Sequence, residues 1–179
     1  RLCDVSALGS VHSLKLHGCP AVRDVSALGS VCNLSLSVVE ASDFTALSSL
    51  RKLHLIECPN ISDVSALAGV DILELNHCNG IRDVSALAHV RDLTLSGIEA
   101  DINYLGTVPH LTLRLMAGLS DLIAFAHVDT LVLNSCPDIC DVSCLAGVRS
   151  LSILDRPGVE DISALERVPK LIIKERDEF

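Results

Sequence analysis

The sequence of 179 residues predicts an α/β solenoid, with a parallel β-sheet on one side and short 3₁₀ or helical turns on the opposite side. Three observations lead to this prediction. A motif that begins with Asp recurs about every 20 residues, and the leucines that follow it alternate over a short segment. The chain is also 49% hydrophobic but only 2% aromatic, with no Trp. A core of small branched side chains of similar size indicates a stack of similar units.

The repeat covers nearly the whole chain. The motif Asp-Val-Ser-Ala-Leu begins at Asp4, Asp24, Asp63 and Asp83, with degenerate copies at Asp43, Asp101, Asp121, Asp141 and Asp161. Successive copies are separated by 20, 19, 20, 20, 18, 20, 20 and 20 residues. With each Asp as position 0, apolar residues fall at positions 1, 4, 7, 10, 12, 15 and 18. We predict one domain over residues 1–179, with about eight to nine repeats of 18–20 residues, as a fragment of a longer protein.

Each repeat is expected to contain one short strand, because the step of two between positions 10 and 12 places both apolar side chains on one side of an extended chain. Clear examples are residues 14–16, 53–55, 73–75 and 93–95. Residues at positions 9, 11 and 13 then point to the other side. Stacking gives each strand hydrogen-bonding neighbours and buries the apolar side chains, which one repeat could not do alone.

The motif itself is expected to form a short helical bend opposite the strand, since apolar residues three apart suit a 3₁₀ path. Ser at position 2, as in Ser65, is expected to cap this bend through its side-chain oxygen, and Ile123 breaks that pattern. The Asp is expected to accept hydrogen bonds from backbone amides of the next turn. Calcium would need six to eight oxygen ligands, which one carboxylate per repeat does not supply.

Two repeats are irregular. The copies that begin at Asp24 and Asp83 are one and two residues short, which predicts tighter turns and altered curvature at 38–40 and 97–99. The following repeats contain Tyr104, Met116 and Phe125, and these larger side chains predict a bend or bulkier packing in the middle of the coil.

Four cysteines share position 15 with other small apolar residues, which indicates a narrow buried slot. They are Cys19, Cys58, Cys78 and Cys136. Cys58 and Cys78 lie in adjacent repeats, but parallel side chains suit a disulfide poorly. Arg156 falls in the same slot, and Leu154 is expected to take the inward place there through a local shift.

A second group of cysteines has a spacing similar to that of zinc ligands. Cys136, Cys140 and Cys144 are spaced by four residues, with His127 upstream. Their positions in the repeat place them on different sides of the coil, whereas zinc needs four converging ligands. We therefore expect no metal site here.

The repeated residues resemble a known family. Leu-x-Leu-x-x-Cys-x-x-Val, formed by Leu14, Leu16, Cys19 and Val22 and again by Leu73, Leu75, Cys78 and Ile81, resembles the leucine-rich repeat, with Cys where Asn is commoner. The Asp-Val-Ser-Ala-Leu bend is similar to the Asp-Ile-Ser-Pro-Leu bend of internalin-type repeats, while the repeat length is nearer to that of short repeats in bacterial effectors. The resemblance implies a right-handed superhelix with the parallel β-sheet on its concave face and the short 3₁₀ or helical turns on its convex face. It also implies that the concave face binds macromolecules.

Charge and composition indicate the class of partner and the cellular compartment. The chain has 14 basic and 23 acidic residues and a net charge of -9, the wrong sign for binding a phosphate backbone. No apolar run is long enough for a membrane helix, and we find no targeting signal. Its ample apolar residues also leave no need for a disulfide framework, so we expect eight free thiols in an intracellular, cytoplasmic protein. The expected partner is a protein, with neither nucleic acid nor membrane, and the oligomeric state stays open.

Catalytic chemistry is weakly indicated. There is no phosphate-binding glycine loop and no regular Ser-His-Asp or Cys-His arrangement on one face, so we expect no catalytic residues, cofactor or metal. His54 and Glu74 share position 11 on neighbouring strands and are expected to lie within contact distance, with His77 nearby. Such groups could bind a metal or act as acid and base, but a solvated polar face explains them equally well.

We therefore expect a non-enzymatic protein-binding module that uses the concave strand face. The side chains at positions 9, 11 and 13 vary between repeats while the framework positions hardly change. The candidate binding residues are Lys15, His17, Lys52, His54, Ile56, Ile72, Glu74, Asn76, Asp92, His110, Arg114 and Val132. The alternatives are a structural spacer, or the substrate-recognition arm of a larger enzyme or effector whose catalytic domain is absent here.

Overall fold

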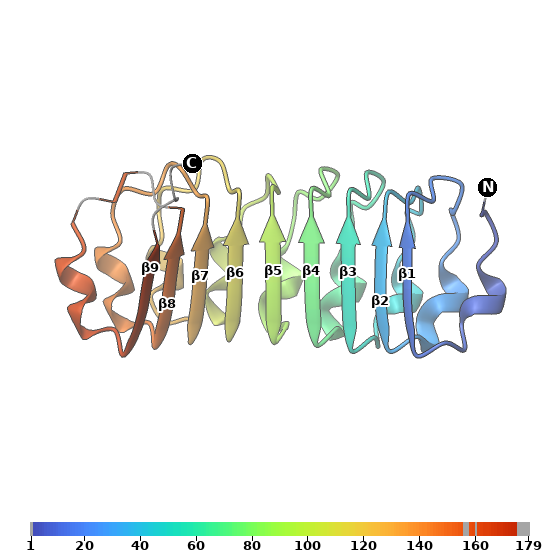
Figure 1. Cartoon of the computed structure of the whole chain (residues 1–179), viewed down its shortest axis with the longest axis horizontal. Helices are drawn as coiled ribbons and strands as arrows, with labels where there is room; N and C mark the ends of the chain where they lie inside the picture. Colours follow the sequence, from blue (N-terminus) through green and yellow to red (C-terminus); the bar gives the residue numbers. More distant parts are fainter. Residues whose placement is uncertain (1, 156–157, 160, 175–179) are drawn as a thin grey trace.

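The computed structural model describes residues 2–155, 158–159 and 161–174, and these form a coil with one strand and one 3₁₀ helix per repeat. The strands make a single parallel sheet in sequence order, and Figure 1 shows them side by side in one layer with 3₁₀ helices behind them. The predicted fold class is confirmed. The strands are β1 Ser13–His17, β2 Asn33–Ser37, β3 Lys52–Ile56, β4 Ile72–Asn76, β5 Asp92–Ser96, β6 His110–Arg114, β7 Thr130–Asn134, β8 Ser150–Leu154 and β9 Lys170–Lys174.

The 3₁₀ helices alternate with the strands along the chain. They are η1 Ser6–Leu8, η2 Ser26–Ser30, η3 Thr45–Leu47, η4 Ser65–Gly69, η5 Ser85–His89, η6 Asn103–Thr107, η7 Ile123–Phe125, η8 Ser143–Gly147 and η9 Ser163–Arg167. Within the described part of the chain, no helix has the length and apolar character needed to cross a bilayer.

The strand register is constant from one end of the sheet to the other. Leu53 pairs with Leu73, and Leu73 pairs with Leu93, so equivalent residues form rows across the strands. These inward leucines are at most 1% exposed. Because every row continues at the same position, a residue's place in the repeat fixes both its face of the sheet and its neighbours.

The helix cap differs from the prediction. Oδ1 of each repeat Asp accepts a hydrogen bond from the backbone N–H two residues later, at 2.8–3.1 Å, and Asp63 with Ser65 is typical. The expected cap by the Ser side chain was wrong, because position 2 is already the first helical residue and Asp can reach its amide from outside. The expected Asp donors in the next turn were also wrong, since the donor N–H belongs to the same repeat. Ile123 therefore breaks nothing, and its N–H lies 2.9 Å from Asp121 Oδ1.

Every strand from β1 to β8 is followed by a residue in the left-handed region, a feature that sequence reasoning missed. Their φ values lie between 50° and 63°, and six of the eight are not glycine. The residues are Gly18, Val38, Glu57, His77, Gly97, Leu115, Ser135 and Asp155. Each donates its N–H to the carbonyl of the last residue of the next strand, as His77 does to Ser96 at 2.8 Å. This bond extends the hydrogen-bond ladder between neighbouring strands by one residue beyond the end of the strand.

The irregular middle repeats follow the prediction in part. Phe125 and Met116 are buried in the core, which confirms bulkier packing, but Tyr104 is 58% exposed and adds nothing to it. Near the C-terminal end, Ile153 takes the inward position of β8, and Leu154 stays half-buried on the outward side, so the expected inward shift was wrong. Arg156 lies outside the described residues.

Candidate binding surface on the strand face

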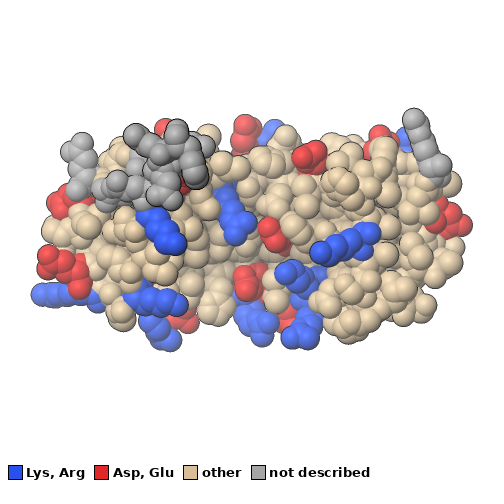
Figure 2. Space-filling view, in the orientation of Figure 1, with Lys and Arg blue, Asp and Glu red and all other residues tan. Residues whose placement is uncertain are grey.

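We define the strand face as the side of the sheet formed by the outward side chains at positions 9, 11 and 13 of β1–β9. All twelve candidate residues lie on it, on β1 and β3–β7, and each is exposed or half-buried. Figure 2 views the molecule in the orientation of Figure 1 and shows basic and acidic side chains interspersed with uncharged ones. The twelve candidate residues therefore belong to an accessible surface.

A polar network occupies the middle of the strand face. His54 Nε2 on β3 lies 3.3 Å from Glu74 Oε1 on β4, as the shared position predicted. Asn76 Nδ2 lies 2.8 Å from the same His54 nitrogen and donates a hydrogen bond to Glu74 Oε1 at 3.1 Å. Arg114 Nη1 on β6 lies 3.8 Å from Glu74 Oε1. These four residues form what we call the central network.

The surroundings of His54 favour its neutral form. Burial lowers the pKa of His54, because a partly desolvated imidazolium is disfavoured. Glu74 opposes this shift, while the positive charges of Lys52, Lys15 and Arg114 add to it. A neutral imidazole whose proton is on Nδ1 can accept the Asn76 amide hydrogen at Nε2. The central network therefore orients the Glu74 carboxylate and presents it beside Arg114.

The remaining candidates lie apart from the central network. His17 is at the far end of β1, whereas Asp92 and His110 are paired in register at the start of β5 and β6. The apolar candidates Ile56 and Ile72 are at opposite ends of their strands. The apolar side chains are therefore scattered among polar ones and do not form a continuous strip.

Two residues at outward positions are unexpectedly buried. Ser37 and Ser96 are 4% and 6% exposed, although both occupy position 13. Each lies between longer side chains on the neighbouring strands, and Ser96 is paired with Asn76 on one side and Arg114 on the other. Both serines also precede one of the two shortened loops. A small side chain between large neighbours is covered even on an outward face.

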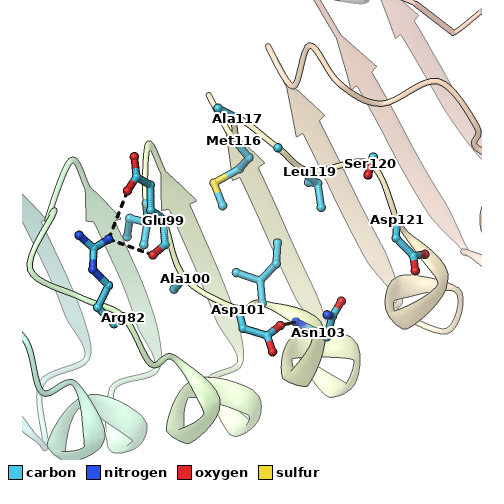
Figure 3. A pocket seen from close by; sticks show the side chains of 13 residues that line it. Arg82, Glu99, Ala100, Asp101, Asn103, Met116, Ala117, Leu119, Ser120 and Asp121 are labelled. Carbon is cyan, nitrogen blue, oxygen red and sulfur yellow. Dashed lines mark hydrogen bonds and ion pairs between the residues drawn. The ribbon is translucent and has the colours of Figure 1, made fainter.

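A cleft of about 380 Å³ lies at the edge of the coil, where the repeat before Asp101 is two residues short (Figure 3). Arg82 Nη1 closes one side by donating to the Glu99 carbonyl oxygen at 3.1 Å and to Glu99 Oε2 at 3.3 Å. Asp101 Oδ1 accepts the Asn103 N–H. The shortened repeat was predicted, but the cleft was not, because its walls come from loops of three successive repeats.

The eight cysteines are free thiols. Cys58 and Cys78 are buried, and both contact with Cys58 and burial raise the pKa of the Cys78 thiol. Of the three cysteines whose spacing is similar to that of zinc ligands, Cys136 is buried, Cys140 is exposed and Cys144 is half-buried. Across the described residues, no three His, Cys, Asp or Glu side chains gather as metal ligands.

A parallel sheet on one side, 3₁₀ helices on the other and a constant register give this chain the fold of a leucine-rich repeat solenoid. Among solved structures it is similar to the internalin InlF of Listeria monocytogenes, with 20% identity and a TM-score of 0.65 over 99% of this chain. It is also similar to the leucine-rich repeat domain of the type III effector XopL, with 14% identity and a TM-score of 0.58. That match covers 91% of this chain and 76% of the XopL domain chain.

This chain spans 58% of the internalin chain that it matches. No protein-family model and no curated protein matches the sequence. At these identities the structural likeness shows the fold alone.

Proposed function

We propose that the chain is a non-enzymatic protein-binding module that receives its partner on the strand face. The observation that carries this proposal is the contrast between the two sides of the same strands. The inward positions are leucine or isoleucine in every strand, while the outward positions carry a different set of side chains on each one. A surface released from packing in this way is free to match a partner.

The chemistry of the strand face supports a protein partner. Glu74 and Arg114 place opposite charges at its centre, and isoleucines such as Ile56 add apolar contact area nearby. Interfaces between proteins combine such apolar and charged groups, whereas binding to a phosphate backbone needs an excess of positive charge, and this chain has a net charge of -9. The free thiols also favour a reducing compartment, and we place the chain inside the cell.

The test is affinity capture from an extract of the source cells, with the wild-type chain and two triple variants as bait. The first variant, His54→Ala, Glu74→Ala and Arg114→Ala, removes three members of the central network. The matched control, His89→Ala, Glu166→Ala and Arg167→Ala, removes the same three residue types from η5 and η9. Circular dichroism checks that both variants fold.

We expect the wild type and the control to capture the same proteins and the strand-face variant to lose them. Equal capture by all three baits would contradict binding through the strand face. Loss with the control variant alone would move the binding surface to the 3₁₀ side of the coil. If no bait captures a protein, the chain acts as a spacer and the proposal fails.

A further inference from the structure

A hollow of about 180 Å³ lies on the strand face over β1–β3. Its position follows from the register, because Ser35 in the middle of β2 is paired with Lys15 on β1 and with His54 on β3. Asn33 is likewise paired with Lys52. Short side chains on β2 therefore form the floor, and the longer side chains of the flanking strands form the walls.

The hollow is basic. Lys15 and Lys52 line it together with His54, and neither lysine forms an ion pair with any residue that the structure describes. The outward positions of β1–β3 contain no acidic residue. They are Ser13, Lys15, His17, Asn33, Ser35, Ser37, Lys52, His54 and Ile56. Glu74 on β4 is the first carboxylate along the strand face, and it is engaged in the central network.

From this geometry we infer that the hollow binds a carboxylate side chain of an acidic segment in the partner protein, seated between Lys15 and Lys52. This inference rests on the proposed function and specifies the partner's chemistry. The hydroxyl of Ser35 and the amide of Asn33 provide hydrogen-bond donors at the floor, and the two ammonium groups provide the charge. The overall negative charge of the chain repels long polyanions, so a short acidic peptide segment fits better than a nucleic acid.

The test uses the whole chain and a short fluorescein-labelled Gly/Ser peptide that contains several glutamates. A second peptide carries glutamine at each of those places. Fluorescence anisotropy measures the binding of both to the wild type, to Lys15→Gln/Lys52→Gln, and to Lys170→Gln/Lys174→Gln. The last variant is the matched control, because it removes the same charge from exposed positions on β9 of the same face.

We expect the glutamate peptide to bind the wild type more tightly than the glutamine peptide, and its affinity to fall as salt rises. The Lys15/Lys52 variant should bind it about tenfold more weakly, and the control should bind it as the wild type does. Equal binding of the two peptides, or an equal loss in the control, would overturn the inference. So would tighter binding of a single-stranded oligonucleotide of the same charge.

Failure here is distinguishable from failure of the proposed function. If affinity capture depends on the strand face but the peptides show no preference for glutamate, the binding face stands and the acidic partner segment is wrong. If glutamate binding requires Lys15 and Lys52 but no protein is captured, the hollow stands as a carboxylate site and the proposed function is wrong.

Discussion

Glu74 Oε1 lies 3.3 Å from His54 Nε2 on the adjacent strand, and Arg114 approaches the same oxygen from two strands away on the other side. The small Ser96 on β5 separates Asn76 from Arg114 in the register, so the long arginine side chain can pass over it towards β4. Contacts at the centre of the strand face thus depend on which strand carries a short residue.

We expect Glu74→Gln to lower the pKa of His54 further, because the negative charge of Glu74 favours the imidazolium. Conversely, Lys52→Gln should raise this pKa by removing a nearby positive charge. NMR titration of the His54 ring protons measures both shifts. The variant Glu166→Gln on η9 is the control and should leave the titration unchanged. An unchanged pKa of His54 in Glu74→Gln would show that the two side chains do not interact in solution.

The same shift predicts how stability depends on pH. The folded pKa of His54 lies below the ordinary imidazole value of about 6.5, so the folded state disfavours the charged form. The contribution of neutral His54 to the free energy of unfolding is therefore complete above pH 6.5. It is lost as the pH falls through the lower pKa of the folded state. We expect His54→Gln to make urea unfolding less sensitive to pH in this window, and an unchanged dependence would contradict the assignment to His54.

The register explains why much of the strand face could be predicted. The outward direction of the side chains at positions 9, 11 and 13 could be predicted from the alternation along each strand. The contact between His54 and Glu74 could be predicted from their shared position in the repeat. The reach of Arg114 could not be predicted, since it depends on side-chain length and on Ser96 beneath it. The left-handed residues were also hidden, because Val38 or Leu115 carries no sequence signal for a positive φ.

A second prediction concerns the Asp caps and acid. Hydrogen bonds from the residue two places later hold the pKa below the ordinary Asp value for seven of the repeat carboxylates. They are Asp4, Asp24, Asp43, Asp63, Asp83, Asp141 and Asp161. The contribution of these ionised carboxylates to the free energy of unfolding is complete above the ordinary pKa of 3.8. It is lost as the pH falls through their lowered pKa values in the folded state. We therefore expect the free energy of urea unfolding to drop steeply in acid.

Single substitutions separate the Asp cap from the Ser side chain. Asp63→Ala should lower the free energy of unfolding at neutral pH more than Ser65→Ala does, because the alanine at 65 keeps the N–H that Asp63 accepts. The difference between Asp63→Ala and the wild type should shrink in acid, where the wild-type carboxyl is protonated. A larger loss of unfolding free energy in Ser65→Ala would show that the Ser65 hydroxyl is the main cap.

A third prediction uses the left-handed residue after β2. Val38 has a φ of 54°, which costs a β-branched L-residue about 1–2 kcal/mol relative to glycine. The freedom of glycine in the unfolded chain cancels about half of that gain. Val38→Gly should therefore raise the free energy of unfolding by about 0.5–1 kcal/mol. The neighbouring control Val39→Gly opens a cavity in the core and should cost about 2 kcal/mol or more. Destabilisation by Val38→Gly would show that its side-chain packing outweighs backbone strain.

A fourth prediction concerns thiol reactivity. Cys3 and Cys140 are exposed and should react first with a maleimide, whereas the buried Cys58, Cys78 and Cys136 should react only as the chain unfolds. Burial also raises the pKa of the Cys136 thiol, which reduces its thiolate fraction. Mass spectrometry of digested samples gives the labelling rate at each site. After unfolding without reductant all eight should react, and a smaller number would reveal a disulfide or a bound metal.

The last prediction tests the narrow core slot at position 4. Leucine fills it in eight repeats, and Phe125, which is fully buried, fills it in the repeat that begins at Asp121. Phe125→Leu should cost about 1 kcal/mol, since the slot already accepts leucine elsewhere and only a small cavity remains. Leu67→Phe should cost about 1–3 kcal/mol, because a ring placed between unchanged neighbours overpacks the stack. Urea unfolding followed by circular dichroism measures both. If Leu67→Phe were neutral, crowding between repeats would not be what keeps aromatic rings out of this coil.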